Sequence, residues 1–184
     1  MIESLQRDDC LVVIDYQKDF VDGLLPCNQP AKDIENFIIE CVEEFHSINN
    51  EGNVIITLDT HEIPKYTISN EGKYYPKHCE KYTEGWLPYG KLKNYMNYTN
   101  THVIEKDTFG SIHLVNYLHT NMKFKNIYVT GVATNVCVLH NVILMYNMLP
   151  DVKINVLAKG CASFDETLHK QALKLMEGFV NVIY

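Results

Sequence analysis

The chain reads Ile127-Tyr128-Val129-Thr130-Gly131-Val132-Ala133-Thr134-Asn135-Val136-Cys137 where β-strand sequence gives way to helical sequence. The first three residues form a short apolar run typical of a strand, which breaks at Thr130-Gly131 before helical periodicity begins. Cys137 is therefore expected among the unpaired backbone N–H groups at the positive end of a helix. A thiol there ionises more readily, which predicts a nucleophile. This segment alone slightly favours the other interpretation, a buried structural cysteine.

Similar apolar, β-branched runs recur along the chain, separated by segments with apolar residues three and four positions apart. Runs this short, without polar alternation, are typical of strands covered on both faces. Strand and helix alternating six times predict a three-layer α/β/α fold with a six-stranded, mostly parallel, doubly wound (Rossmann-like) sheet. We expect one domain over residues 1–184. The expected strands are 10–14, 54–58, 102–104, 127–130, 154–157 and 179–183, and the expected helices are 33–42, 111–118, 138–145 and 168–176.

Length, charge and composition exclude several classes of protein. The 184 residues are 46% hydrophobic, which is enough for one substantial core and short for two. The net charge of −7 argues against a nucleic-acid partner. The chain opens without a basic region followed by an apolar run, and no apolar run approaches membrane-spanning length. We therefore expect a soluble cytoplasmic protein with no membrane partner. The six cysteines include no C-x-x-C pair and are expected to stay reduced.

The residues that follow the expected strands are the first candidates for function, because ligands bind beyond the carboxyl ends of the strands in open α/β sheets. Asp15 follows the first strand, Lys106 the third and Cys137 the fourth. In a parallel sheet these side chains converge, and an acid, an amine and a thiol together form a nucleophilic constellation. The carboxylate can accept the thiol proton, and the ammonium favours both anions. Taken singly, Asp15 also fits a helix cap, and Lys106 fits an exposed ion pair worth about 0–1 kcal/mol.

The second expected strand ends in Asp59-Thr60-His61, whose first and third side chains point to the same side of an extended chain. A carboxylate and an imidazole placed in this way form half of a metal site. His78 and Glu71 lie in the long Tyr- and Pro-rich segment 60–98, which we expect to be a loop insertion that binds metal and substrate. Two histidines with one or two carboxylates suit a divalent metal, with Zn²⁺ first and Fe²⁺ or Mn²⁺ as alternatives. A solvated Asp–His pair is the simpler interpretation of Asp59 and His61 alone.

Several separated motifs resemble, in the same order and along almost the whole chain, those of the isochorismatase-like cysteine hydrolases. The motifs at 57–61 and 76–79 resemble the metal-containing nicotinamidases within that superfamily. The matching motifs are Val13-Ile14-Asp15-Tyr16-Gln17-Lys18-Asp19-Phe20, Thr57-Leu58-Asp59-Thr60-His61, Pro76-Lys77-His78-Cys79, Glu105-Lys106, Gly131-Val132-Ala133-Thr134-Asn135-Val136-Cys137-Val138, and Cys161-Ala162-Ser163-Phe164 followed by His169.

The resemblance implies a role for each matching residue. Cys137 is expected to be the nucleophile, Asp15 the general base and acid, and Lys106 their electrostatic partner. A cis peptide bond is expected before Ala133, whose amide is expected to form an oxyanion hole with that of Cys137. The implied metal ligands are Asp59, His61 and His78, with Glu71 as a fourth, and the implied substrate-binding residues are Phe20, Tyr75, Phe109 and Val132.

The implied activity is hydrolysis of nicotinamide, and of pyrazinamide, to the acid and ammonia through a cysteine thioester, with nicotinate feeding NAD salvage. Nicotinamide is the expected partner, and a homo-oligomer stays open because the family is often oligomeric. Two other interpretations stay open as well: a metal-independent hydrolase of N-carbamoyl or ureido compounds, and a catalytically silent binding module of the same fold. The metal motif argues against the first, and the complete set of Asp15, Lys106 and Cys137 argues against the second.

Overall fold

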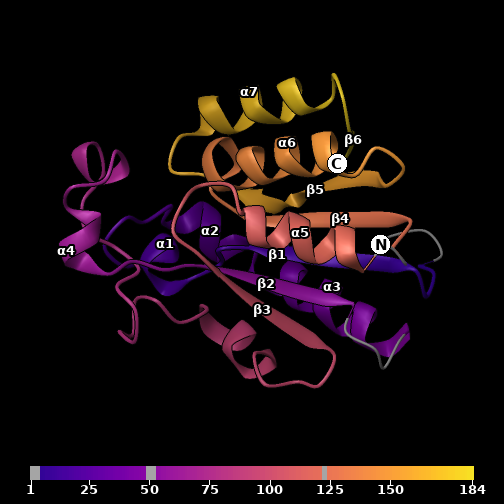
Figure 1. Ribbon diagram of the computed structural model, residues 1–184, viewed down its shortest axis with the longest axis horizontal. Helices are drawn as coiled ribbons and strands as arrows, with labels where there is room; N and C mark the ends of the chain where they lie inside the picture. Colours follow the sequence, from indigo (N-terminus) through magenta and orange to yellow (C-terminus); the bar gives the residue numbers. More distant parts are fainter. Residues whose placement is uncertain (1–4, 49–52, 122–123) are drawn as a thin grey trace.

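A six-stranded sheet forms the centre of the molecule in the computed structural model, which describes residues 5–48, 53–121 and 124–184 (Figure 1). The strand order is β3-β2-β1-β4-β5-β6. Every neighbouring pair is parallel, so the predicted α/β sheet is confirmed and is parallel throughout. The strands are β1 (Asp9–Ile14), β2 (Val54–Asp59), β3 (Thr101–Lys106), β4 (Asn126–Val132), β5 (Lys153–Ala162) and β6 (Asn181–Ile183).

Helices cover both faces of the sheet. One group packs around α3 on one face, and α5, α6 and α7 lie side by side on the other (Figure 1). Ser111 and Asp165 accept hydrogen bonds from Leu114 N and Leu168 N, which explains where α5 and α7 begin. The helices of the first group are α1 (Lys18–Val21), α2 (Gln29–Asp33) and α3 (Glu35–Ile48), and those of the second are α5 (Ile112–Thr120), α6 (Leu139–Met148) and α7 (Glu166–Met176).

Burial follows from the position of each strand in the sheet. Every residue of β1 and β2 is buried, as expected for apolar strands covered on both faces. The edge strand β3 has only Ile104 and Lys106 buried. Burial of Lys106 is unusual for a lysine and needs a compensating partner. This residue ends its strand on the side of the molecule that carries α1, α2 and α4 (Figure 1).

β3, β4 and β5 are longer than their apolar runs predict, and β6 is shorter. β5 continues to Ala162, with a change of register against β4 between Val129 and Gly131. β4 itself continues through Gly131 to Val132, so the helical turn begins later than the break at Thr130-Gly131 indicated. The side chain of Val132 is fully buried and belongs to the hydrophobic core.

The segment 60–98 is less irregular than its composition indicated. It contains a short helix, α4 (Ile63–Tyr66), and two 3₁₀ helices, η1 (Glu71–Lys73) and η2 (Gly90–Tyr95). Across the described ranges, no helix is long and apolar enough to cross a membrane. Residues 1–4, part of the opening stretch used to argue against a secretion signal, lie outside the described residues.

Gly131 brings the ends of β1 and β4 into close contact. Its φ is +124°, and a Cβ at this position would lie 2.0 Å from the carbonyl oxygen of Ile14. A larger residue would therefore push the two strands apart where Asp15 leaves β1. The peptide bond between Val132 and Ala133 is cis, as the resemblance implied. Thr134–Val138 then forms a single π-helical segment, η3, that leads into α6.

Candidate functional site

Three side chains from different strand ends meet below the surface. Asp15 follows β1, Lys106 ends β3, and Cys137 lies in η3 after β4. The Lys106 Nζ atom lies 2.6 Å from Asp15 Oδ2 and 3.7 Å from Cys137 Sγ. All three residues are buried, with at most 4% of their surface exposed. The parallel sheet therefore brings together the acid, the amine and the thiol that follow its strands.

Asp15 is held by Thr57 of the neighbouring strand β2. The Thr57 hydroxyl donates to Asp15 Oδ1 at 2.6 Å, and its oxygen accepts from the Asp15 amide at 3.1 Å. Asp15 has a φ of 47°, in the left-handed region that non-glycine residues seldom occupy. The hydroxyl therefore binds both the side chain and the backbone of Asp15, and stabilises this uncommon conformation.

The three groups change one another's ionisation. Burial raises the pKa of the Asp15 carboxyl, an effect that Lys106 opposes and Asp59 reinforces. Burial also lowers the pKa of Lys106, but Asp15 and Asp59 outweigh this and keep it well above its usual value. The pKa of the Cys137 thiol is raised by burial, lowered by Lys106, and raised again by Asp15 and Asp59. Burial and the two carboxylates thus oppose the ready ionisation that the helix end predicts, while Lys106 favours it.

A second group of side chains lies next to the first and is joined to it by Asp59. Asp59 Oδ1 accepts a hydrogen bond from Lys106 Nζ at 3.0 Å, while Asp59 Oδ2 lies 2.9 Å from His61 Nε2 and 3.2 Å from His78 Nε2. Glu71 Oε1 lies 3.3 Å from His78 Nε2. One ligand atom from each of Asp59, His61, Glu71 and His78 lies within 4.8 Å of all the others, so the four predicted residues form a candidate metal site.

The hydrogen bonds of His78 test whether this donor set fits a metal ion. The Nδ1 atom of His78 lies 2.8 Å from the Pro76 carbonyl oxygen, which can only accept, so Nδ1 carries a proton. In a neutral ring, Nε2 then presents a lone pair toward two carboxylate oxygens. Burial lowers the pKa of His78, yet Asp59 and Glu71 raise it to about 10. The cluster therefore favours a positive charge, and two imidazole nitrogens with two carboxylates are a donor set suited to Zn²⁺, Fe²⁺ or Mn²⁺.

An apolar cavity adjoins both groups of side chains. It is narrow, with a volume of about 20 Å³, so an aromatic ring enters only if side chains move aside. Tyr75 and Phe109 contact each other edge to face, with ring centroids 5.9 Å apart, and also line an outer hollow of about 440 Å³. They therefore form the partition between the cavity and the outside. The cavity is lined by Phe20, Leu25, Cys27, Glu71, Tyr75, His78, Phe109, Ala133, Val136, Cys137 and Phe164.

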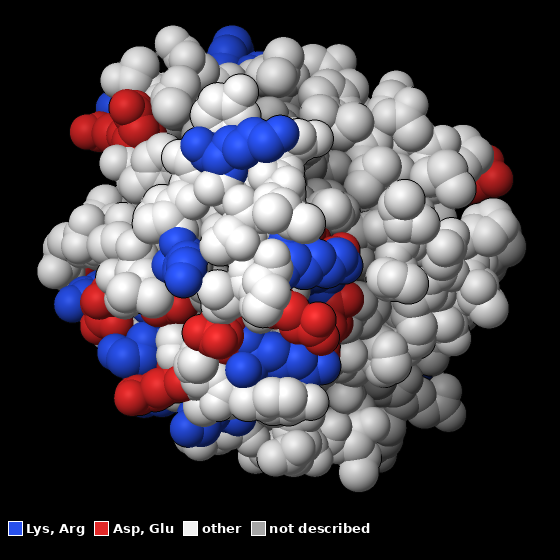
Figure 2. Space-filling view, turned by 60° about the vertical axis from the view of Figure 1, so that its left-hand side comes forward, with Lys and Arg blue, Asp and Glu red and all other residues white. Residues whose placement is uncertain are grey.

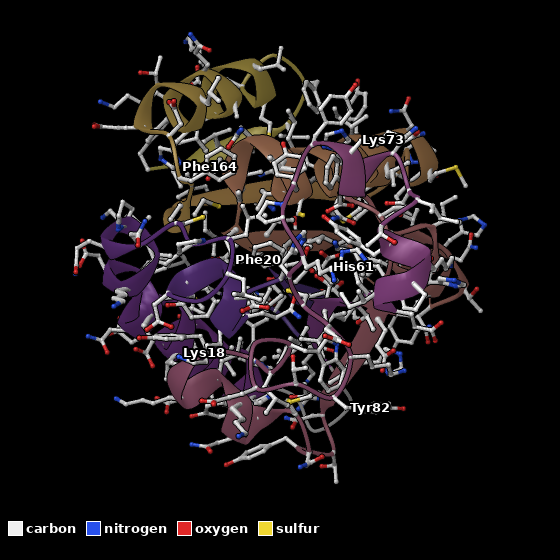
Figure 3. The ribbon with its side chains drawn as sticks, turned by 90° about the vertical axis from the view of Figure 1, so that its left-hand side faces the viewer. Lys18, Phe20, His61, Lys73, Tyr82 and Phe164 are labelled. Carbon is white, nitrogen blue, oxygen red and sulfur yellow. The ribbon has the colours of Figure 1, made fainter. Side chains whose placement is uncertain are left out.

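Among the four residues expected to bind substrate, three line this cavity. The ring of Phe20 lies 5.1 Å from that of His78. Phe20 and His61 lie near the middle of the face shown in Figure 3, with Phe164 to one side. Val132 packs into the core instead, because β4 extends through it, and its neighbour Ala133 reaches the cavity.

A charged hollow of about 200 Å³ lies against His61. Its wall includes the ion pairs Lys65–Asp107, at 2.8 Å, and Lys81–Glu105, at 2.6 Å. Basic and acidic side chains also lie next to each other on the face shown in Figure 2. The candidate metal site thus lies between an apolar cavity at Glu71 and His78 and a charged hollow at His61.

Two buried amides that the sequence did not single out link segments around the site. Gln17 Nε2 donates to the carbonyls of Asp59 and Trp86, each at 2.8 Å, and its Oε1 accepts from Asp59 N. Asn141 Nδ2 donates to the carbonyls of Phe109 and Cys137, at 2.9 and 2.7 Å. Each residue binds at least one backbone group that is more than 30 residues away, and such contacts leave no motif.

Comparison with known proteins places these observations in a family context. The model described as the isochorismatase domain matches residues 9–184. A Bacillus subtilis (strain 168) protein, described as the uncharacterized isochorismatase family protein PncA, is 32% identical over 177 residues, covering 89% of this chain and 91% of its own. The solved structures with similar folds include those of two nicotinamidases. Nicotinamidase/pyrazinamidase PncA from Bacillus subtilis has 26% identity and a TM-score of 0.86, over 96% of this chain and 100% of that one. Nicotinamidase SaPncA from Staphylococcus aureus has 28% identity and a TM-score of 0.77, over 98% and 100%.

Proposed function

This chain belongs to the isochorismatase family, and we propose that it is a nicotinamidase, which hydrolyses nicotinamide and pyrazinamide to the acid and ammonia. The observation that carries the proposal is that Cys137, which Lys106 joins to Asp15, lines a cavity that is also lined by Glu71 and His78. A nucleophile and a candidate metal site thus face the same apolar space. The similarity to PncA nicotinamidases, at 26–28% identity, supports the same activity.

In the first step, Cys137 Sγ attacks the carbon of the substrate amide and its proton passes to Asp15. Burial raises the pKa of Asp15 as well as that of the thiol, so Asp15 takes a proton more readily than an ordinary carboxylate does. Lys106 remains an ammonium and stabilises the carboxylate before the transfer. The amides of Ala133 and Cys137 are the proposed donors to the oxyanion.

In the second step, the tetrahedral intermediate collapses as Asp15 gives its proton to the leaving nitrogen, so ammonia departs and a thioester remains on Cys137. Asp15 then accepts a proton from a water molecule that attacks the thioester carbon. Collapse of this second intermediate breaks the carbon–sulfur bond, and the proton returns to the sulfur. Each cycle therefore consumes one water and restores the thiol.

Asp59, His61, Glu71 and His78 are the proposed ligands of a divalent metal, for which Zn²⁺ is the first candidate. When bound, such an ion would supply an electrophilic anchor for the ring nitrogen of the substrate. Phe20, Tyr75 and Phe109 would hold the ring itself, since all three line the cavity. Orientation of the amide toward Cys137 by these contacts is worth up to about 7–11 kcal/mol of the barrier in favourable cases.

Ammonia release by purified, metal-quantified protein tests the proposal. We expect turnover of nicotinamide and pyrazinamide, and little turnover of benzamide, which has the same shape but no ring nitrogen. An N-carbamoyl amino acid serves as the ureido substrate. Turnover of that compound without turnover of nicotinamide would show that the protein is a ureido hydrolase instead. No turnover of any of these compounds would favour the catalytically silent binding module.

A further inference from the structure

Asp19 is a buried carboxylate close to the proposed metal site whose role the proposed reaction does not explain. It lies in α1, beside Phe20, and is 4% exposed. Its Oδ2 accepts a hydrogen bond from the Cys79 amide at 2.7 Å, and its Oδ1 accepts one from the Leu24 amide at 3.1 Å. Both oxygens therefore bind backbone N–H groups of segments that adjoin the cavity.

The partner Cys79 is placed between both histidines of the candidate metal site. It directly follows His78, and its carbonyl oxygen accepts a hydrogen bond from the His61 amide at 3.0 Å. Cys79 has a φ of +46°, in the left-handed region, which a non-glycine residue occupies when its surroundings enforce it. The hydrogen bond to Asp19 is one such restraint, and it acts on the backbone that carries His78.

The surrounding chain leaves room for this carboxylate. A Cβ at Gly85 would lie 2.4 Å from the carboxyl carbon and from both carboxylate oxygens of Asp19. A Cβ at Gly23 would lie 2.4 Å from Asp19 Oδ1. The Asp19 amide also donates to the Gly85 carbonyl at 2.9 Å. Two glycines thus pack against one acidic side chain, whose place in the fold is tightly defined.

We propose that Asp19 is a positioning residue for the metal site. It holds the Cys79 peptide so that the Nε2 atoms of His78 and His61 face Asp59 and Glu71. The inference rests on the proposed function, because it requires that these four residues bind a metal ion. Groups that orient metal ligands without touching the metal typically contribute about 10–100-fold to metal affinity. Asp19 lies in α1 together with Phe20, so its hydrogen bond to Cys79 also fixes Phe20 relative to His78.

The test compares Asp19→Asn with Asp9→Asn. Asparagine keeps the shape of Asp19 but has one acceptor oxygen and an NH₂ group, so it cannot accept from both backbone amides. Asp9 is a matched control, because it is 1% exposed and accepts from Gln6 N and Asn126 Nδ2 at the opposite end of β1. Zn²⁺ affinity is measured on the full chain by competition with a chromophoric chelator, and stability is measured by urea unfolding with chelator present.

We expect Asp19→Asn to bind Zn²⁺ about 10–100-fold more weakly, and Asp9→Asn to lose stability without losing affinity. Gly85→Ala leaves Asp19 in the sequence but displaces its carboxylate, so it is expected to weaken Zn²⁺ binding in the same way and serves if Asp19→Asn does not fold. The double variant Asp19→Asn/Gly85→Ala is expected to bind Zn²⁺ no more weakly than Asp19→Asn alone, because both changes act on one contact.

Wild-type affinity in Asp19→Asn, or an equal loss in Asp9→Asn, would overturn the inference and leave the proposed metal site standing. Failure of the unaltered protein to bind Zn²⁺ would overturn the metal site and this inference together.

Discussion

Replacement of Lys106 by methionine removes the positive charge that lies between two buried carboxylates. Its Nζ lies 2.6 Å from Asp15 Oδ2 and 3.0 Å from Asp59 Oδ1, and the three side chains are between 0 and 2% exposed. Methionine fills nearly the same volume, so the packing change is small. Solvent scarcely screens these contacts, and the charge is the main quantity that the substitution changes.

The size of the effect follows from this geometry. At these distances each contact is worth on the order of 6 kcal/mol at an effective dielectric constant of about 20. The cost of removing the ions from water offsets part of this attraction, and breaking a buried pair by removing one partner typically costs about 3–5 kcal/mol. We expect Lys106→Met to lower the free energy of unfolding by about 3–5 kcal/mol and to abolish turnover. The Lys65–Asp107 pair is the matched control, because its side chains are 72% and 58% exposed at 2.8 Å.

Urea unfolding of both variants with chelator present measures the difference, since a bound cation would otherwise offset the charge of Asp59. Lys65→Met is expected to change stability by less than about 1 kcal/mol. Without Lys106, the folded-state pKa of Asp15 rises further above its unfolded value, because burial raises it and the main opposing charge is gone. The folded variant then binds more protons than the unfolded chain. The difference in unfolding free energy between the unaltered protein and Lys106→Met should therefore shrink as pH falls from about 7 to about 4. Equal losses of unfolding free energy in Lys106→Met and Lys65→Met, or a loss in Lys106→Met that does not change with pH, would refute the reasoning.

Three further substitutions separate the remaining roles. Cys137→Ala is expected to abolish ammonia release with unchanged zinc content, and appreciable turnover would exclude Cys137 as the nucleophile. Glu71→Gln is expected to lower zinc content measured by mass spectrometry, and full content would remove Glu71 from the ligands. Thr57→Val deletes the 2.6 Å hydrogen bond to Asp15, so kcat should fall about 10–100-fold, corresponding to about 1.5–3 kcal/mol, with little change in KM. An unchanged kcat would show that Asp15 needs no such support.

The fold and the first residues of the site follow from short-range patterns. The apolar runs predict all six strands. The signal is simplest for β1 and β2, which are covered on both faces and have no polar side, whereas the edge strands β3 and β6 are partly exposed. The meeting of Asp15, Lys106 and Cys137 then follows from parallel strands alone, since their carboxyl ends share one edge. The spacing of Asp59 and His61 predicts their shared direction in the same way.

The remaining features depend on contacts between distant segments. Gln17 and Asn141 bind backbone groups of Asp59 and Phe109, and every residue has such groups, so nothing in the sequence marks their partners. The extension of β4 through Val132 depends on pairing with β5, where Val132 lies opposite Ala162. The raised pKa of Cys137 does not follow from the sequence, because the sequence shows the helix end and not the depth of burial.

Asp59 makes the thiol group and the candidate metal group one electrostatic unit. One of its oxygens binds Lys106, and the other faces His61 and His78, so a change on either side alters the charge felt by the other. Burial opposes ionisation of Asp59, but Lys106 and both histidines hold its pKa below the usual range, so it is an anion shared by both groups. A substitution at Asp59 would therefore disturb Lys106 and the metal ligands together. Glu71 contacts His61 and His78, so Glu71→Gln measures what the metal contributes to turnover more cleanly than a substitution at Asp59 does.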